Sequence, residues 1–228
     1  MNDKVRELVE QIGATAAKVT SFVAEYDMTM HYKRVSLHSR GKLYYADKTR
    51  CRVEGITNGQ RIITVSRNGA RQTYFVDQKV ISRFNTIEDQ SPIDLLHGLS
   101  DIRDSFSSTD TESLVYIGET LLEGQTVYHF RGHFPVLPMF GFAKVSLPIE
   151  VDLFIEQATC LLRRRVWTET GKRALVTTNY RIVGINIPLE DSLFSIDVSS
   201  SGIRAVETVD VTKTLFFDDD ENQGASTN

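Results

Sequence analysis

The sequence has little of several features that point to a particular class of protein. It has only two cysteines, five prolines and one tryptophan in 228 residues. Two widely spaced cysteines are too few for a disulfide scaffold and do not make a metal-binding motif. No apolar run has the length that a bilayer span needs, and a net charge of −4 gives no basic surface for nucleic acid. With 41% apolar and 25% charged residues, the chain has the composition of an ordinary globular protein.

Motifs that carry catalysis are also missing. The chain contains no phosphate-binding loop, nucleophile elbow, zinc-protease motif or dinucleotide fingerprint. His129 and His133 are four residues apart on a predicted strand, about 13 Å from each other, which is too far for one metal ion. Asp94, His97 and Asp101 share one side of a predicted helix, and a solvated helix face explains them. We expect no enzyme, no metal and no cofactor, although catalytic residues need not be close in sequence.

A long alternating segment near the N-terminus is the strongest pattern that the sequence does contain. From Phe22 to Tyr32 apolar and polar residues alternate, which predicts a strand of an antiparallel sheet with one buried and one solvated face. The apolar face consists largely of tyrosine and methionine: Tyr26, Met28, Met30 and Tyr32. Methionine is flexible and polarizable and suits surfaces that adapt to different partners. Ordinary core packing explains each residue singly, so both interpretations stay open.

The rest of the chain predicts more short strands, two helices and a polar tail. The apolar spacing in Lys4–Lys18 and Ser91–Phe106 predicts amphipathic helices that lie on the sheet. Turn signals such as Asn58-Gly59 indicate a chain of tight hairpins, and we count eleven or twelve antiparallel strands. Residues 1–213 are predicted to form one mainly β domain of the α+β class, and the acidic segment 214–228 is predicted to be disordered.

The segment Pro135–Ala143 is almost wholly apolar, although it contains two prolines and a glycine. It is therefore neither a good helix nor a strand interior. It either covers the end of the core or flanks the mouth of a cavity. The residues of this loop that need shielding are Leu137, Met139, Phe140 and Phe142.

The cysteines and a run of arginines are interpreted as structural. Cys51 and Cys160 lie in strand-like stretches and are expected to be buried free thiols, with a single disulfide as the alternative. Arg163, Arg164 and Arg165 alternate across a predicted strand, so the three do not form one patch. Arg163 and Arg165 share one side and are expected to meet acidic side chains of a neighbouring strand.

The order of these elements resembles that of a known family. A helix leads into VTSFVAEYDMTM, which is followed by GKLYYADKTRCRVE, NGQRIITVSRNGARQTYFV and another helix, and TTNYRIVGINIPLEDSLFSIDV comes late in the chain. This order is similar to that of the bacterial lipoprotein-carrier superfamily, which includes LolA and the outer-membrane lipoprotein-sorting proteins, over most of residues 5–212. The strand after LYYADKTR lacks the aromatic-rich, proline-containing form of the carrier proper. The chain therefore resembles a distant member.

The resemblance implies an unclosed half-barrel of about eleven strands, lidded by two or more helices, with a hydrophobic cavity for the acyl chains of a lipoprotein or lipid. It also implies a periplasmic or cell-envelope location and a membrane-bound donor or acceptor protein. The signal segment of the family is absent from this chain, which keeps a cytoplasmic location as the alternative. The alternation, rather than a family motif, selects the cavity and lid residues: Tyr26, Met28, Met30, Tyr32, Leu43, Tyr45, Val53, Ile63, Leu96, Leu99 and Ile102.

Three functions from different classes remain. The first is a monomeric carrier that binds acyl chains and no nucleic acid. The second is an interaction or sensor module on the same fold with a collapsed cavity, and a co-purifying lipid separates these two. The third is an enzyme, which we rank last because the predicted inward positions offer only tyrosine hydroxyls and Ser39.

Overall fold

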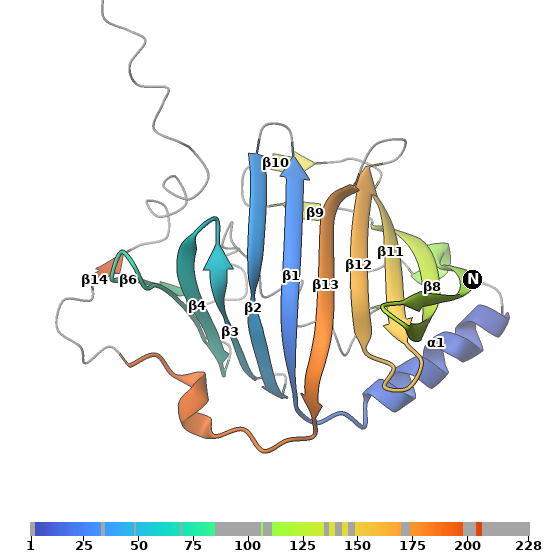
Figure 1. Cartoon of the computed structure of the whole chain (residues 1–228), viewed down its shortest axis with the longest axis horizontal. Coiled ribbons are helices and arrows are strands. Elements are labelled where there is room, and N and C mark those ends of the chain that lie inside the picture. The colour runs from blue at the N-terminus through green and yellow to red at the C-terminus, as the bar shows by residue number, and fades with distance from the viewer. Residues whose placement is uncertain are drawn as a thin grey trace, which may run out of the picture.

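The structure is a computed structural model that describes residues 3–32, 35–47, 49–68, 70–84, 106, 111–134, 137–139, 143–145, 149–169, 174–197 and 204–206. Its main feature is one large sheet (Figure 1). The strands of this sheet are β1 (Phe22–Tyr32), β2 (Val35–Asp47), β3 (Arg50–Thr57), β4 (Gln60–Arg67), β5 (Ala70–Phe75), β6 (Val80–Phe84), β7 (Val115–Leu122), β8 (Gln125–Phe134), β11 (Ile149–Glu156), β12 (Leu162–Glu169), β13 (Ala174–Ile185) and β14 (Arg204–Val206).

The twelve strands follow the order β14-β6-β5-β4-β3-β2-β1-β13-β12-β11-β8-β7. β14 runs parallel to β6, and the other neighbouring strands are antiparallel. Among the described strands the two ends of this order do not pair with each other, so the sheet is not closed into a barrel. The predicted fold class, a mainly β half-barrel built on one curved antiparallel sheet, is confirmed.

The first six strands form the predicted meander, in which each strand pairs with the one before it. The turn between β3 and β4 shows why. Asn58 and Gly59 have positive φ angles of 45° and 83°, as a two-residue hairpin turn of the mirror-image type requires. This turn pairs Thr57 with Gln60 and thereby fixes the register of both strands.

The second half of the sheet is joined to the first by a long-range contact. β13 pairs with β1 from Phe22–Ile185 to Met30–Val176, and β12, β11, β8 and β7 follow outward. The predicted loop Pro135–Ala143 is in part a small separate sheet, because β9 (Leu137–Met139) pairs with β10 (Ala143–Val145). The expectation that no strand forms there is therefore wrong for these residues.

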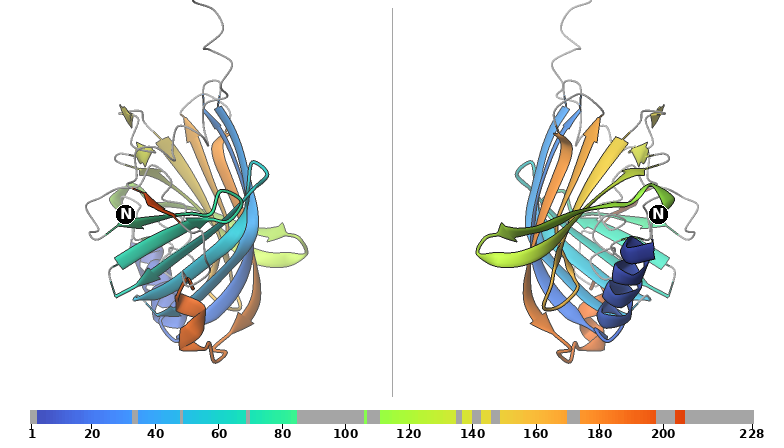
Figure 2. Two further views of the ribbon diagram at one scale, coloured as in Figure 1. Left: turned by 90° about the vertical axis from the view of Figure 1, so that its left-hand side faces the viewer. Right: turned by 90° about the vertical axis from the view of Figure 1, so that its right-hand side faces the viewer.

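The helix α1 (Asp3–Ala16) lies on the concave side of the sheet, and the β7–β8 hairpin projects beyond the opposite side (Figure 2). Val5, Ile12 and Ala16 of α1 are buried in the same core cluster as the concave residues of the sheet. No helix among the described residues is long and apolar enough to cross a membrane. The predicted helix Ser91–Phe106 and the tail 214–228 lie outside the described residues, except for Phe106, which packs edge-on against Phe130 at 5.2 Å.

A pair of glycines allows a close approach of the backbones of β2 and β3. Gly41 and Gly55 are direct cross-strand partners, and Tyr26 on β1 is the partner of Gly41. A Cβ atom on Gly55 would lie 2.5 Å from Tyr26 Oη and would also clash with the carbonyl oxygen of Arg40. The Tyr26 hydroxyl therefore occupies space that a side chain on Gly55 would need.

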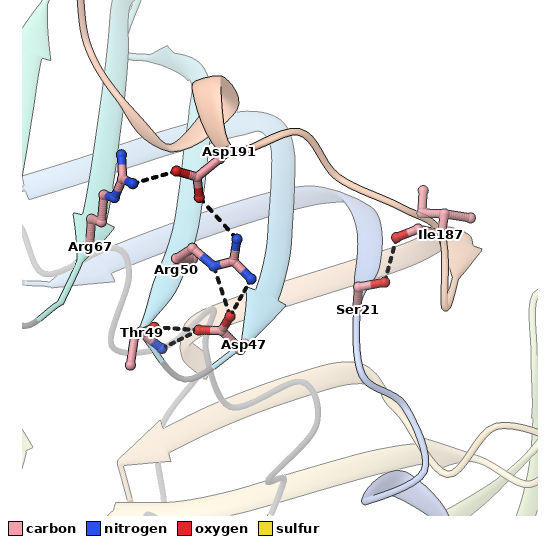
Figure 3. A network of polar contacts seen from close by, with 7 residues as sticks. All are labelled: Ser21, Asp47, Thr49, Arg50, Arg67, Ile187 and Asp191. Carbon is pink, nitrogen blue, oxygen red and sulfur yellow. Dashed lines mark hydrogen bonds and ion pairs between the residues drawn. The ribbon is translucent and has the colours of Figure 1, made fainter.

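A strap after β13 crosses one end of the sheet (Figures 1 and 3). The Ser21 hydroxyl donates to the carbonyl of Ile187 at 2.6 Å where the strap begins. The strap contains the 3-10 turn η2 (Asp191–Phe194). A second 3-10 turn, η1 (Thr111–Ser113), is not part of the strap and precedes β7. Asp191 accepts hydrogen bonds from Arg50 on β3, at 3.0 Å, and from Arg67 on β4. Phe194 is fully buried, so the strap is part of the folded core.

The glycine pair leads to a stability prediction. We expect Gly55→Ala to lower the free energy of unfolding by about 2–3 kcal/mol, because the new methyl group meets backbone and the Tyr26 hydroxyl. Gly13→Ala in α1 is the control, since a Cβ there meets nothing within 4 Å, and it should raise stability by about 0.5–1 kcal/mol. Urea unfolding monitored by circular dichroism measures both. Equal stability of Gly55→Ala and wild type would contradict the close approach.

Candidate functional site

The concave face of the sheet carries most of the predicted cavity residues. Direct cross-strand partners share a face, so Ala24, Leu43 and Val53 form one row and Phe22, Tyr45 and Cys51 form the next. Together with Tyr26, Met28 and Met30 on β1, the side chains of Leu43, Tyr45 and Val53 are all buried. The structure thus brings six of the predicted residues together on one face: Tyr26, Met28, Met30, Leu43, Tyr45 and Val53.

The remaining predicted residues are placed differently or not described. Ile63 lies on the opposite face, because it pairs with Glu54, whereas the concave Val53 pairs with Thr64. Ile62, which pairs with Gly55, is the concave residue of β4 instead. The structure describes only the backbone, which lies in strands, for Tyr32, Leu137 and Met139. The positions that lie outside the described residues are Leu96, Leu99, Ile102, Phe140 and Phe142.

The concave face is an interior surface rather than an open one. Met28 has the largest exposed fraction of these six residues, at 8%. Phe22 and Tyr45 stack with their ring centroids 4.9 Å apart, and the face forms one core cluster with α1. The side chains of this face are therefore packed together here.

An apolar row crosses this face over five strands. Cross-strand pairs align Val151, Trp167, Val176, Met30 and Leu37 on β11, β12, β13, β1 and β2. Neighbouring strands are about 4.8 Å apart, so the row is about 19 Å long. Met30 brings a flexible side chain to the row, and Trp167 brings a large one. Such a row offers an extended apolar surface without a polar interruption.

A second row beside it contains buried polar groups. It aligns Leu153, Arg165, Thr178, Met28, Ser39 and Thr57. Ser39 Oγ is hydrogen bonded to Thr57 Oγ1 at 2.8 Å and to Tyr26 Oη at 3.1 Å. Burial raises the pKa of Tyr26, so its hydroxyl stays protonated at neutral pH.

A separate set of hydroxyl side chains lies toward the β6 side of the sheet, in register with Val53 of β3. Thr64, Thr73 and Ser82 are buried and in register on β4, β5 and β6. The hydroxyls of Thr64 and Thr73 are hydrogen bonded at 3.2 Å, and Ser82 Oγ is buried without a hydrogen-bond partner among the described residues. The polar side chains in these two sets are all hydroxyls, except for Arg165.

Arg165 is the concave residue that the sequence interpretation missed. Arg163 and Arg165 were expected to share a face, but a β-bulge in β12 separates them. Leu162 pairs with Ile155 and Arg164 with Phe154, so Arg163 is the extra residue and Arg165 faces the concave side opposite Leu153. Arg163 does meet an acidic neighbour on β11, since its guanidinium lies 3.6 Å from Glu156. The guanidinium carbon of Arg165 lies over the ring of Trp167, 4.8 Å from its centroid.

The opposite, convex face carries a groove of about 600 Å³. Its walls carry charges of both signs from β13, β1 and β2, and Glu123 at the tip of the β7–β8 hairpin also lines it. The charged residues of the groove are Glu25, Asp27, Arg40, Lys42, Glu123 and Arg181. Two of these charged residues neutralise each other, because Arg181 forms an ion pair with Glu25.

The paired histidines have separate structural surroundings. His129 Nε2 lies 2.7 Å from Asp152 Oδ1, and its ring stacks on Phe154 at 4.4 Å. The backbone N–H of His133 donates to Ser113. Within the described ranges no group of three or more His, Cys, Asp or Glu residues is arranged to hold a metal ion. The helical set Asp94, His97 and Asp101 lies outside these ranges.

Comparison with known proteins adds information on the fold. No protein-family model and no curated protein sequence matches the chain. An uncharacterized conserved protein from Thermus thermophilus is similar in structure, with a TM-score of 0.56 and 14% identity over 88% of this chain and 99% of that chain. MucB is similar with a TM-score of 0.50 and 11% identity, and the match covers 84% of this chain and 62% of MucB.

A weaker match is the Mycobacterium tuberculosis lipoprotein LppX, with a TM-score of 0.49 and 14% identity over 83% of this chain and 99% of that chain. At such identities the first two likenesses show the fold alone. Together with the observed topology they agree with the unclosed half-barrel fold that the sequence predicts.

The two thiols lead to a prediction on reactivity. Cys51 and Cys160 are free and buried, and burial raises the pKa of Cys51 to about 12 and also raises that of Cys160. Because only the thiolate reacts, we expect neither thiol to react with Ellman's reagent at pH 8 in the folded protein, and both to react in denaturant. The Cys51→Ala variant retains Cys160 alone, so comparison with wild type assigns the reaction of each thiol. Rapid reaction of a thiol in the folded protein would show that the concave face opens.

Proposed function

We propose that the protein binds acyl chains of a lipid or lipoprotein on the concave face of its half-barrel and acts as a non-catalytic carrier in the cell envelope. The observation that carries this proposal is the apolar row that crosses five strands of that face, from Val151 on β11 to Leu37 on β2. The described sheet is open on both edges, and α1 is the described element that covers the face.

The make-up of the apolar row supports an acyl ligand. Met30 lies at the centre of the sheet with Met28 one row away, and methionine side chains re-pack readily around a changing partner. Burial of methylene groups stabilises a complex by about 0.8 kcal/mol for each CH₂. Ten buried methylenes therefore contribute about 8 kcal/mol before the cost of ordering the chain is subtracted.

Binding requires the covered face to open, because its side chains are packed in the structure. α1 contributes three buried side chains to the core, Val5, Ile12 and Ala16, and two partly buried ones, Leu8 and Val9. A helix with so small a buried face is easier to displace than a strand paired on both edges. We propose that the acyl chain enters between α1 and the apolar row.

A second function, recognition of a protein partner, is favoured by the convex face. The groove of about 600 Å³ there is open and charged, and the neighbouring edge strand β7 has exposed apolar side chains, with Leu121 71% exposed. Edge strands and exposed apolar patches are common interaction sites. This function needs no acyl ligand.

Native mass spectrometry of protein purified from its own host tests the two functions directly. We expect a bound acyl-containing molecule in stoichiometric amount, released on denaturation and identified by lipid analysis. A lipid-free mass, together with no binding of a fluorescent fatty acid, would reject the carrier function and favour the protein partner.

A substitution in the apolar row tests the location. We expect Met30→Glu to weaken binding of a fluorescent fatty acid at least roughly tenfold, because the row then carries a buried charge. Thr29→Glu on the opposite face of β1 is the matched control and should bind as wild type does. Thermal unfolding checks that both variants fold. If the two variants bind alike, the acyl chain lies elsewhere.

A further inference from the structure

We infer that Thr64, Thr73 and Ser82 form a head-group site on the concave face, which takes the uncharged, hydroxyl-bearing head of an acyl ligand such as a monoacylglycerol. This inference rests on the proposed function and adds the class of ligand. The three residues are direct cross-strand neighbours on β4, β5 and β6. Three observations on their hydroxyl groups carry the inference.

The hydroxyl of Ser82 is the first observation. Ser82 is 2% exposed, and its Oγ atom has no hydrogen-bond partner within the part of the chain that the structure describes. A buried polar group without a partner is costly, because it has lost its bonds to water and gained none in return. An alanine at this position would remove that cost. A serine therefore fits a site at which a bound molecule supplies the missing partner.

The contrast between two sets of hydroxyls on this face is the second observation. The hydroxyl of Ser39 is hydrogen bonded to two other side-chain hydroxyls, at 2.8 and 3.1 Å, so that set is satisfied internally. Thr64 and Thr73 are bonded only to each other, at 3.2 Å, among the described side chains. Such a bond uses one of their two O–H donors. One donor of this pair and the donor of Ser82 are therefore left for a ligand.

The change from apolar to polar along one row is the third observation. Cross-strand pairs align one residue on each strand from β1 to β6: Ala24, Leu43, Val53, Thr64, Thr73 and Ser82. At about 4.8 Å for each strand spacing, the row is about 24 Å long. On β1 the same face continues to Met28 and Met30, since side chains alternate along a strand. The apolar half of the row thus leads into the part of the face that is proposed to hold the acyl chain.

The chemistry of the three side chains favours an uncharged head. None of them carries a charge, and a carboxylate or phosphate buried beside hydroxyls alone would be costly. Arg71 lies on the same face of β5, two residues from Thr73, but it has an interaction of its own. A head with an ester carbonyl and hydroxyls accepts hydrogen bonds from the O–H groups and donates to their oxygens. A monoacylglycerol has both kinds of group.

Three ligands with the same lauroyl chain test the head group on the full chain. Wild-type protein is titrated with 1-monolauroylglycerol, methyl laurate and laurate below their micelle concentrations, and binding is measured by calorimetry and by displacement of a fluorescent fatty acid. We expect monolauroylglycerol to bind at least about tenfold more tightly than methyl laurate, which lacks its hydroxyls. We also expect it to bind more tightly than laurate, which is charged. Equal binding of the two esters, or tighter binding of laurate, would overturn the site.

Two variants test the residue itself. Ser82→Ala should remove the preference for monolauroylglycerol without lowering the melting temperature of the ligand-free protein, because no described hydrogen bond is lost. Ser39→Ala is the matched control, since it also removes a buried serine hydroxyl from the concave face but breaks two hydrogen bonds. It should lower the melting temperature and keep the wild-type preference. A fall for Ser82→Ala as large as that for Ser39→Ala would reveal a structural partner of Ser82 and reject the site.

The outcomes separate this inference from the proposed function. If no acyl ligand binds the wild-type protein, both are wrong. If acyl ligands bind wild type without a preference for monolauroylglycerol, the head-group site is wrong and the carrier function stands. The comparison of the ligands on wild-type protein decides this even if Ser82→Ala does not fold. A preference that Ser82→Ala retains would also reject the site.

Discussion

Strand β1 decides which side of the sheet becomes the interior, because neighbours pair along both of its edges. β2 pairs with it from Phe22–Tyr45 to Tyr32–Val35, and β13 from Phe22–Ile185 to Met30–Val176. Since direct partners share a face, the alternation of β1 is imposed on the rest of the sheet. A slip of one residue would turn every concave side chain outward. The register of this one strand therefore places the apolar row and Arg165 together.

Much of the fold is readable from the sequence because its signals are local. The alternation from Phe22 to Tyr32 predicts β1 with its observed bounds, and the Asn58-Gly59 turn predicts its hairpin. The same turn could also have corrected Ile63. A two-residue loop pairs Thr57 with Gln60, and counting back along both strands pairs Val53 with Thr64 and leaves Ile63 on the convex side. The error arose because Ile62 and Ile63 are both apolar, and composition alone does not choose between them.

The candidate site was less predictable because it depends on features that are not local. The pairing of β1 with β13 joins residues 146 to 163 positions apart, from Met30–Val176 to Phe22–Ile185, and no turn signals it. The bulge at Arg163 reverses the alternation of β12, so Leu162 and Arg165 share a face although strict period-2 spacing would separate them. The three consecutive arginines gave no sign of where the extra residue lies. The polar end of the concave face was therefore invisible in the pattern.

The strap from β13 to β14 limits how the half-barrel can deform. It is held at Ser21 by Ile187, at Arg50 and Arg67 by Asp191, and at β6 by the parallel pairing of β14. The contacts of Ile187 and Asp191 link the strap to the start of β1, to β3 and to β4. No described strand pairs with the outer edge of β7, and the strap does not reach that side. The β7–β12 side of the sheet therefore has fewer attachments than the β3–β6 side, so a change in the width of the molecule is expected to begin there.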